Sequence, residues 1–115
     1  MNKRQVGTQY ESMAVQYLTE AGYHILERNF RCRTGEIDII AKDGAYLVFV
    51  EVKYRASAAS GSALEAVDYR KQQSILRVAQ YYMVSHGYGT QTNCRFDVVA
   101  IQGTEITLIQ NAFGA

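Results

Sequence analysis

Asp38, Glu51 and Lys53 have the residue types and spacing that could hold a divalent cation and act on a ligand beside it. They flank Asp43-Gly44, a two-residue hairpin signal between two runs of β-branched and aromatic residues. With these two residues as the turn, Glu36 faces Glu51, and Asp38 is the diagonal neighbour of Glu51. Diagonal neighbours have Cα atoms about 7–8 Å apart. Two carboxylates at that separation can converge on one hard cation.

The alternation of a β-strand divides this predicted hairpin into a charged face and an apolar face. One face carries Glu36, Asp38, Glu51 and Lys53, and the other carries Ile37, Ile39, Tyr46, Val48, Val50 and Val52. Three crowded acids repel one another, which is costly for a fold. The alternative interpretation is a surface cluster of salt bridges. It is less favoured, because exposed ion pairs contribute little and need no such arrangement.

A helix is predicted over residues 4–21, because apolar residues recur there at helical spacing and Gly22 can end it. Glu11 lies at the edge of the apolar stripe. It is either a boundary residue that reaches solvent or a further acid that leans toward Asp38 and Glu51. Spacing alone favours the first interpretation.

Strands are predicted over 23–33, with a bend at Asn29, and over 35–42, 45–54, 95–101 and 105–109. A capping-box pattern at 62–65 begins a second helix that runs to about residue 85, with a break near Asp68. Lys71 falls in phase with the apolar stripe of that helix, and it either snorkels outward or points along the sheet to the acids.

The order α-β-β-β-α-β-β predicts an α/β fold with a mixed sheet of about five strands and two main helices. The strands before and after the second helix should pair in parallel. The two helices cover opposite faces of the sheet or share one. At 115 residues, of which 48% are hydrophobic and 20% charged, residues 1–115 are expected to form one domain with one core.

Neither a membrane span nor a signal peptide is visible in the sequence, so a cytoplasmic protein without a membrane partner is expected. Cys32 and Cys94 have no metal-type spacing and are predicted to be free thiols. The net charge is only +1. Basic residues nevertheless gather on both sides of the acidic hairpin, which would suit a phosphate backbone. Charge alone equally favours the alternative that these are scattered surface arginines that keep the protein soluble. The candidate nucleic-acid contacts are Arg31, Arg33, Arg55 and Lys71.

The segments Gly35-Glu36-Ile37-Asp38 and Phe49-Val50-Glu51-Val52-Lys53, at this spacing, resemble the motif of the YraN-type endonuclease family. That family belongs to the PD-(D/E)XK superfamily, which has a restriction-endonuclease-like core, and it is distantly similar to archaeal Holliday junction resolvases. The resemblance runs from Gly7 to about Val99 and includes Glu11, Asn29, Arg55, Lys71 and the segment 95–99. One departure is that Ile37 stands where the motif has proline.

The resemblance implies that Asp38 and Glu51 are metal ligands and that Lys53 is the catalytic lysine. It also makes Glu11 a fourth acid of the site. The two carboxylates, with the Val52 backbone carbonyl as an extra oxygen, suit Mg²⁺ or Mn²⁺. Glu36 either binds a second ion or pairs with Lys53.

The expected function is metal-dependent endonuclease activity on phosphodiester bonds in DNA, including branched or junction DNA in repair or recombination. A homodimer is expected if the enzyme resembles resolvases in this respect as well. Two alternatives remain at this stage: a non-catalytic nucleic-acid-binding module that keeps the nuclease fold, and a subunit of a larger DNA-processing complex. Metal-dependent cleavage separates the enzyme from the binding module.

Overall fold

The computed structural model describes residues 3–55 and 67–114. The elements are α1 (Lys3–Glu20), β1 (His24–Cys32), β2 (Gly35–Asp43), β3 (Tyr46–Arg55), α2 (Tyr69–Ser85), β4 (Cys94–Gln102) and β5 (Glu105–Phe113). This order confirms the predicted α/β class and its α-β-β-β-α-β-β sequence of elements. Neither described helix combines the length and apolarity that crossing a membrane requires. Cys32 and Cys94 are free thiols, as predicted.

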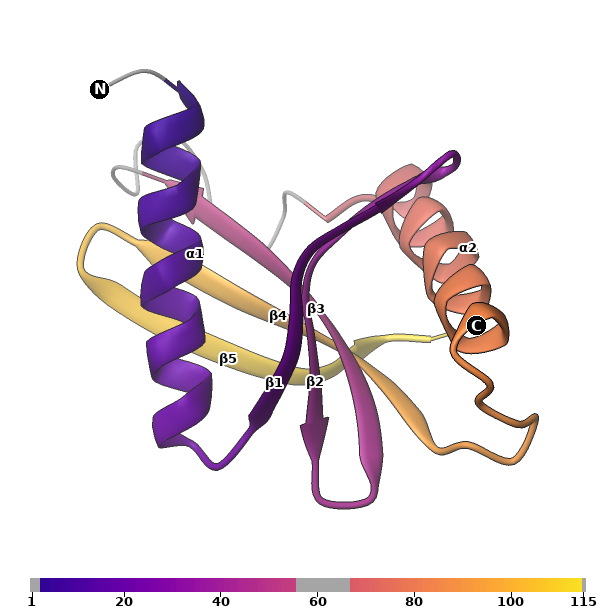
Figure 1. The fold of residues 1–115 in the computed structure, drawn as a ribbon. Helices are drawn as coiled ribbons and strands as arrows, with labels where there is room; N and C mark the ends of the chain where they lie inside the picture. Colours follow the sequence, from indigo (N-terminus) through magenta and orange to yellow (C-terminus); the bar gives the residue numbers. More distant parts are fainter. Residues whose placement is uncertain (1–2, 56–66, 115) are drawn as a thin grey trace.

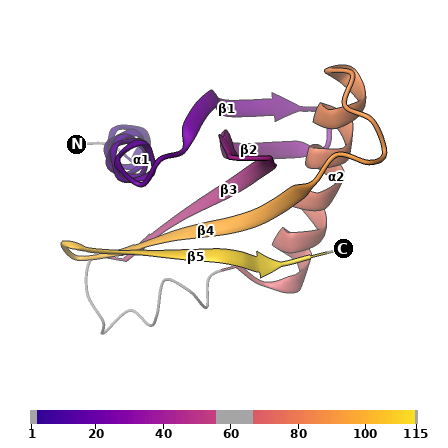
Figure 2. The same ribbon diagram turned by 90° about the horizontal axis from the view of Figure 1, so that it is seen from below.

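The five strands form one mixed sheet in the order β1-β2-β3-β4-β5. β3 and β4 are parallel and are connected through α2, whereas the other neighbouring pairs are antiparallel. The two helices lie on opposite sides of the sheet (Figures 1 and 2). Of the two arrangements that the sequence left open, the structure therefore has one helix on each face.

Each helix covers its own hydrophobic cluster. Successive side chains of β3 point to opposite faces of the sheet, so this strand contributes residues to both clusters. On the α1 side, Ala14 and Leu18 pack with residues that include Val48 and Val50. On the α2 side, the cluster consists of Ile37, Ile40, Leu47, Phe49, Ile75, Val78, Ala79, Tyr82 and Phe96. The sheet is thus buried on both faces where the helices cross it, which fixes β3 between two packed layers.

The ends of the elements follow from local backbone chemistry. Gly22 has φ = 99°, and the Tyr23 N–H donates to the Leu18 carbonyl at 2.9 Å, which closes the C-terminus of α1. Asn29 has φ = 54°, which confirms the predicted bend in β1. α2 begins after Asp68, whose side chain accepts a hydrogen bond from the Lys71 N–H. The described helix thus begins next to the predicted break, whereas the capping box at 62–65 and the predicted helix before residue 67 lie outside the described residues.

The β2–β3 turn lies one residue later in the chain than predicted. The last pair of the ladder is Asp43 with Tyr46, so Gly44 and Ala45 form the turn in place of Asp43 and Gly44. Gly44 has φ = 58°, at the position where a type II′ hairpin turn requires glycine. Asp43 stays in the strand because its carboxylate accepts a hydrogen bond from Arg95 at 2.8 Å. Facing residues are consequently shifted by two positions from the predicted register.

The prediction for Ile37 was wrong, because it packs with the α2-side cluster and not with Ile39. The β2–β3 ladder ends at the pair Ile39 and Val50. Beyond that pair the two strands separate, so β2 no longer follows the alternation that pairing with β3 imposes. This separation of β2 from β3 is the feature that creates the candidate site.

Candidate active site

A cavity of ≈ 210 Å³ opens where β2 and β3 separate. Its lining combines residues of α1 with residues of α2, although the two helices lie on opposite faces of the sheet. The separated strands leave a passage between those faces, which a continuous ladder would close. The lining residues are Gly7, Glu11, Glu36, Asp38, Glu51, Val52, Lys53, Tyr54 and Lys71. The structure thus brings together the acids and the lysine that the sequence singled out.

Asp38 takes the place of a backbone partner at this point of the sheet. Its Oδ2 accepts a hydrogen bond from the Val52 N–H at 2.8 Å. Burial raises the pKa of Asp38 above its ordinary value, and Glu36 adds to the rise, while the Val52 hydrogen bond and the Lys71 and Lys53 charges oppose it. The sequence predicted Asp38 as the diagonal neighbour of Glu51 in a continuous ladder. The observed ladder ends at Ile39 and Val50, so the two acids are not paired through the backbone.

Glu51 is the most deeply buried acid of the cavity, with a side chain only 5% exposed. Burial is the main reason why its pKa rises to about 7, and the Asp38 charge raises it further. Two lysines oppose this rise: Lys53 Nζ lies 3.5 Å and Lys71 Nζ 3.8 Å from Glu51 Oε1. Lys71 therefore points at the acidic cavity, which decides between the two orientations predicted for it.

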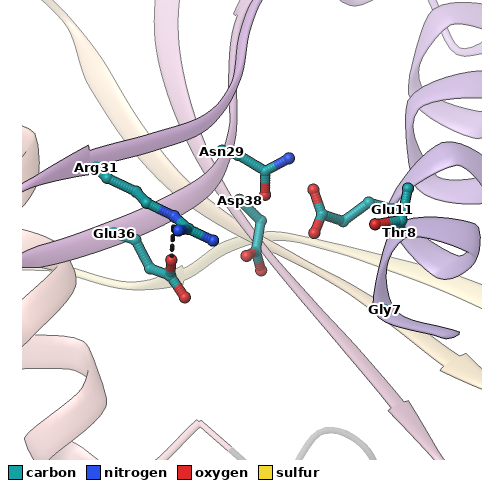
Figure 3. Close-up of a pocket in the computed structure, with 7 residues that line it drawn as sticks. All are labelled: Gly7, Thr8, Glu11, Asn29, Arg31, Glu36 and Asp38. Atoms are coloured by element: carbon teal, nitrogen blue, oxygen red, sulfur yellow. Dashed lines mark ion pairs between the residues drawn. The ribbon is translucent and has the colours of Figure 1, made fainter. Parts of the chain in front are cut away.

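Glu11 projects from α1 toward Asp38, as Figure 3 shows. Its Oε1 is buried and has no hydrogen-bond partner among the residues that the structure describes. Burial and then the Asp38 charge raise the pKa of Glu11, while Arg28 and the Asn29 side chain lower it. Of the two interpretations of Glu11, the structure favours the acid that leans toward the site. Sequence reasoning placed Asn29 at a bend and within the family resemblance but not among the site residues, yet it lines the larger cavity between α1 and the hairpin.

The remaining predicted residues have contacts other than with the two metal-ligand candidates Asp38 and Glu51. Glu36 pairs with Arg31 at 3.0 Å, and not with Lys53 as one interpretation expected (Figure 3). Arg33 lines an adjoining cavity together with Lys71. Arg55 donates to the carbonyl of Tyr54. The nucleic-acid contacts predicted for these arginines stay predictions.

The donor groups of the cavity fit a small divalent cation. In residues 3–55 and 67–114, no three His, Cys, Asp or Glu side chains form a ready-made metal cluster. Mg²⁺ does not require one, because it keeps several waters and binds through one or two carboxylates. Asp38 and Glu51 supply those carboxylates. The N–H and C=O of a strand residue point the same way, so the Val52 carbonyl faces the side where its N–H meets Asp38.

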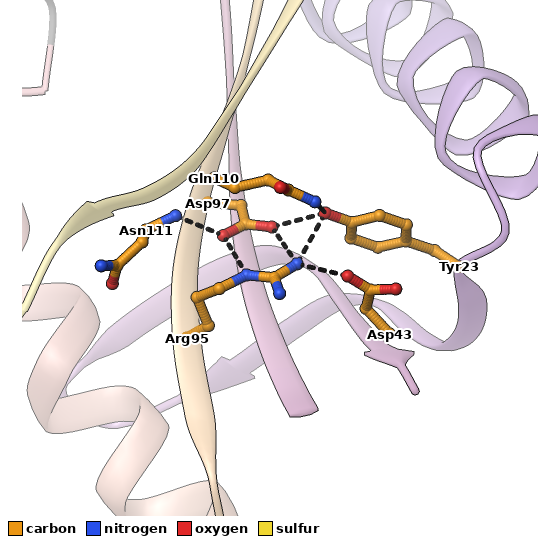
Figure 4. Close-up of polar contacts among 6 residues, drawn as sticks. All are labelled: Tyr23, Asp43, Arg95, Asp97, Gln110 and Asn111. Atoms are coloured by element: carbon orange, nitrogen blue, oxygen red, sulfur yellow. Dashed lines mark hydrogen bonds and ion pairs between the residues drawn. The ribbon is translucent and has the colours of Figure 1, made fainter. Parts of the chain in front are cut away.

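A second polar cluster, which sequence reasoning missed, lies toward the β2–β3 turn (Figure 4). The fully buried Asp97 accepts hydrogen bonds from Arg95, from the Tyr23 hydroxyl at 2.7 Å and from the Asn111 N–H at 2.9 Å. Arg95 also pairs with Asp43 at 2.8 Å. The available signal was Arg95-Phe96-Asp97, with two opposite charges on one side of a strand otherwise buried. Every partner is satisfied, so this cluster connects β4 with the α1–β1 junction and β5.

Comparison with known proteins gives relatives along the full length of the chain. A relative from Lachnoclostridium phytofermentans, a UPF0102 protein, is 50% identical over 115 residues, covering 100% of this chain and 98% of the relative. UPF0102 proteins from Stutzerimonas stutzeri and Caldicellulosiruptor saccharolyticus are 47% and 46% identical, over 93% and 98% of this chain and 92% and 100% of their own lengths. The profile described as "Uncharacterised protein family UPF0102" matches residues 10–101, a range that contains Glu11, Asp38, Glu51, Lys53 and Lys71. The chain belongs to the UPF0102 family.

Proposed function

We propose that this protein is a metal-dependent endonuclease of the PD-(D/E)XK superfamily that hydrolyses phosphodiester bonds in DNA. One observation carries the proposal. The half-buried Asp38 and the buried Glu51 line one cavity at the point where β2 and β3 separate, with Lys53 Nζ 3.5 Å from Glu51 Oε1. An Asp followed by Glu-x-Lys on the next strand is the arrangement of that superfamily.

The cost of burying Glu51 and Glu11 favours a functional explanation for these acids over a structural one. Burying a carboxylate is costly unless it is fully paired. Asp97 meets that condition, whereas Glu51 keeps a pKa of about 7 despite two nearby lysines. In the described part of the chain, the buried Oε1 of Glu11 has no hydrogen-bond partner. Acids left in this state destabilise the apo fold, which is expected where function has been kept at the expense of stability.

Each residue of the cavity has a role in the proposed hydrolysis. Asp38, Glu51 and the Val52 carbonyl would hold Mg²⁺ or Mn²⁺. The ion would lower the pKa of a bound water and polarise the phosphate. Lys53 would stabilise the negative charge that develops on the phosphate as the water oxygen attacks phosphorus. The raised pKa of Glu11 gives its carboxylate a higher affinity for a proton. Glu11 would therefore orient the attacking water or accept the proton that this water releases.

The proposal extends to substrate and partners. Branched or junction DNA in repair or recombination is the proposed substrate, and a cytoplasmic homodimer, or a subunit of a larger DNA-processing complex, is the proposed form. The candidate contacts Arg31, Arg33 and Lys71 lie around the acidic cavity and complement a polyanion.

A second candidate function is a nucleic-acid-binding module that does not cleave. The observation in its favour is that the described residues contain no cluster of three acids or other metal ligands ready for a cation. Such a module would keep the basic residues around the cavity and lose the need for Glu51 and Lys53.

The test incubates branched, nicked, single-stranded and duplex substrates with Mg²⁺ or Mn²⁺ and either wild-type protein or Lys53→Ala. A lysine ammonium has no lone pair for a metal, so the variant should keep metal binding and most nucleic-acid binding. Its cleavage rate should fall by about 10²–10³-fold, the usual cost of removing one group that stabilises transition-state charge. Lys42→Ala, near the β2–β3 turn, is the matched control and should cleave normally. Binding without cleavage by the wild type would favour the binding module, and absence of both would reject both functions.

A further inference from the structure

Two cavities that adjoin the acidic site share the same α2 residues and form one groove, here called the α2 groove. One cavity, of ≈ 530 Å³, lies along α2, and the other, of ≈ 400 Å³, lies between α2 and the β1–β2 turn. Lys71 and Ser74 line both. Of the lining residues that the structure describes, six are cationic and two are acidic. The cations are Arg31, Arg33, Lys53, Arg70, Lys71 and Arg77, and the acids are Glu36 and Asp68.

The two acids of the α2 groove are already occupied. Glu36 pairs with Arg31 at 3.0 Å, and Asp68 accepts the Lys71 N–H at 2.9 Å as the cap of α2. Within residues 3–55 and 67–114, no carboxylate forms an ion pair with Arg33, Arg70 or Arg77. The groove therefore carries positive charge that an anion from outside the chain would neutralise.

The walls of the α2 groove are held at a fixed separation by close packing. Gly35 has φ = 148°, and a Cβ there would lie 2.8 Å from Ser74 Oγ and 3.2 Å from Val78 Cγ2. Only glycine permits this approach of the β1–β2 turn to α2. A groove formed before the ligand arrives avoids the cost of ordering its walls during binding.

The opposite side of the acidic site has the reverse charge. The cavity between α1 and the hairpin, of ≈ 540 Å³, is lined by Glu11, Glu36 and Asp38 together with uncharged residues. Among the residues that the structure describes, its one lining cation is Arg31, which is paired with Glu36. A phosphate on this side would meet these carboxylates, and the described lining offers it no unpaired cation, so binding there is unfavourable.

We propose that the nucleic-acid backbone is held on one side of the scissile phosphate only. Phosphates on that side lie in the α2 groove, with Lys71 nearest the acids and Arg70, Arg77 and Arg33 beyond it. Phosphates on the other side, toward α1, are not bound. This inference rests on the proposed function for the position of the scissile phosphate, and it makes the enzyme tolerant of substrates that lack charged backbone on the α1 side.

The first experiment measures binding of a fluorescent DNA oligonucleotide as a function of salt, without divalent metal, for wild type, Arg70→Gln, Arg77→Gln and Lys42→Gln. Removing one phosphate contact lowers the slope of log K against log salt by about 0.7 to 0.9. We expect that decrease for Arg70→Gln and Arg77→Gln, and no change for Lys42→Gln, which removes the same charge near the β2–β3 turn. Equal behaviour of all three variants, or no binding at all, would overturn the α2 groove as the binding surface. Because this experiment needs no cleavage, it decides the groove even if the proposed enzymatic activity fails.

The second experiment tests one-sidedness in a substrate that the wild type cleaves, by replacing single phosphates around the cut with neutral methylphosphonates. We expect slower cleavage when the replaced phosphates lie on one side of the cut, and little change when they lie on the other. Arg70→Gln should erase the effect of replacement at one or two positions on the sensitive side. Equal sensitivity on both sides, with cleavage intact, would overturn this inference and leave the proposed function standing.

Discussion

Replacing Glu51 by glutamine should flatten the dependence of stability on pH, because this buried acid is held in an unfavourable state when ionised. Its pKa is about 7 in the folded chain, against an ordinary value of 4.5. Between these two values the folded chain binds more protons than the unfolded chain, so the free energy of unfolding falls as pH rises. The stability that protonated Glu51 contributes is fully present below pH 4.5 and is lost as pH rises through about 7.

The magnitude follows from the same two values. One pKa unit is worth about 1.4 kcal/mol, so the displacement of Glu51 corresponds to a loss of at most about 3 kcal/mol between pH 4.5 and pH 8. Part of this loss is shared with Asp38, whose charge is the second cause of the raised pKa. Glutamine has nearly the same shape and does not titrate, so Glu51→Gln should gain stability relative to wild type as pH increases.

The assay is urea unfolding at pH 5, 6, 7 and 8 with EDTA present, for wild type, Glu51→Gln and Glu105→Gln. Glu105 is an exposed glutamate at the start of β5, and its variant controls for loss of a surface charge. Saturating Mn²⁺ should restore wild-type stability at pH 8 and have little effect on Glu51→Gln, because the cation competes with the proton for the same oxygens. Parallel pH curves for wild type and Glu51→Gln would refute the burial argument and weaken the proposed metal site.

Two further predictions concern the structural roles of single residues. Asp38→Asn keeps an oxygen that can accept the Val52 N–H and removes the charge beside Glu51. Its stability should therefore stay within about 1–2 kcal/mol of wild type or rise, while Mn²⁺ binding measured by calorimetry is lost. Asp38→Ala leaves that N–H unpaired and should cost about 1–3 kcal/mol, so similar stabilities for both variants would contradict the hydrogen bond. Tyr23→Phe removes a donor to Asp97 and should cost about 1–3 kcal/mol in urea unfolding with Mn²⁺ affinity unchanged.

The sequence predicts the elements of this fold because their signals are local. Hydrophobic periodicity locates both helices and all five strands, and Gly22 and Asn29 mark a helix end and a bend by their backbone preferences. β5 extends to Phe113, beyond the predicted end at residue 109, for a reason that is not local. Asn111 has φ = 54°, and its N–H donates to Asp97 on β4, so a tertiary hydrogen bond continues the strand through a polar segment.

The β2–β3 hairpin shows which features of the candidate site can be predicted from a sequence motif and which cannot. The observed register is shifted by two positions from the predicted one, and a shift of two leaves the side chains of the paired residues on their predicted faces. Glu36 and Asp38 lie beyond the ladder, where Ile37 departs from its predicted face, yet they line one cavity with Glu51 and Lys53 as the motif predicted. The end of the ladder at Ile39 and Val50 could not be predicted, because it depends on packing against both helices and on the Asp38 side chain.

The buried carboxylates Asp97 and Glu51 differ in how completely their charges are compensated. This difference indicates a structural role for Asp97 and a functional role for Glu51. Asp97 has both oxygens occupied by donors from Arg95, Tyr23 and Asn111, so its charge holds three elements together. Glu51 is nearly as buried and has two lysines at 3.5 and 3.8 Å, yet its pKa is still raised to about 7. A fold that can compensate one buried carboxylate completely has no structural reason to leave another incompletely compensated beside an open cavity. The incomplete compensation is what a divalent cation and a phosphate would correct, so loss of the pH effect on adding Mn²⁺ tests the function as well as the electrostatics.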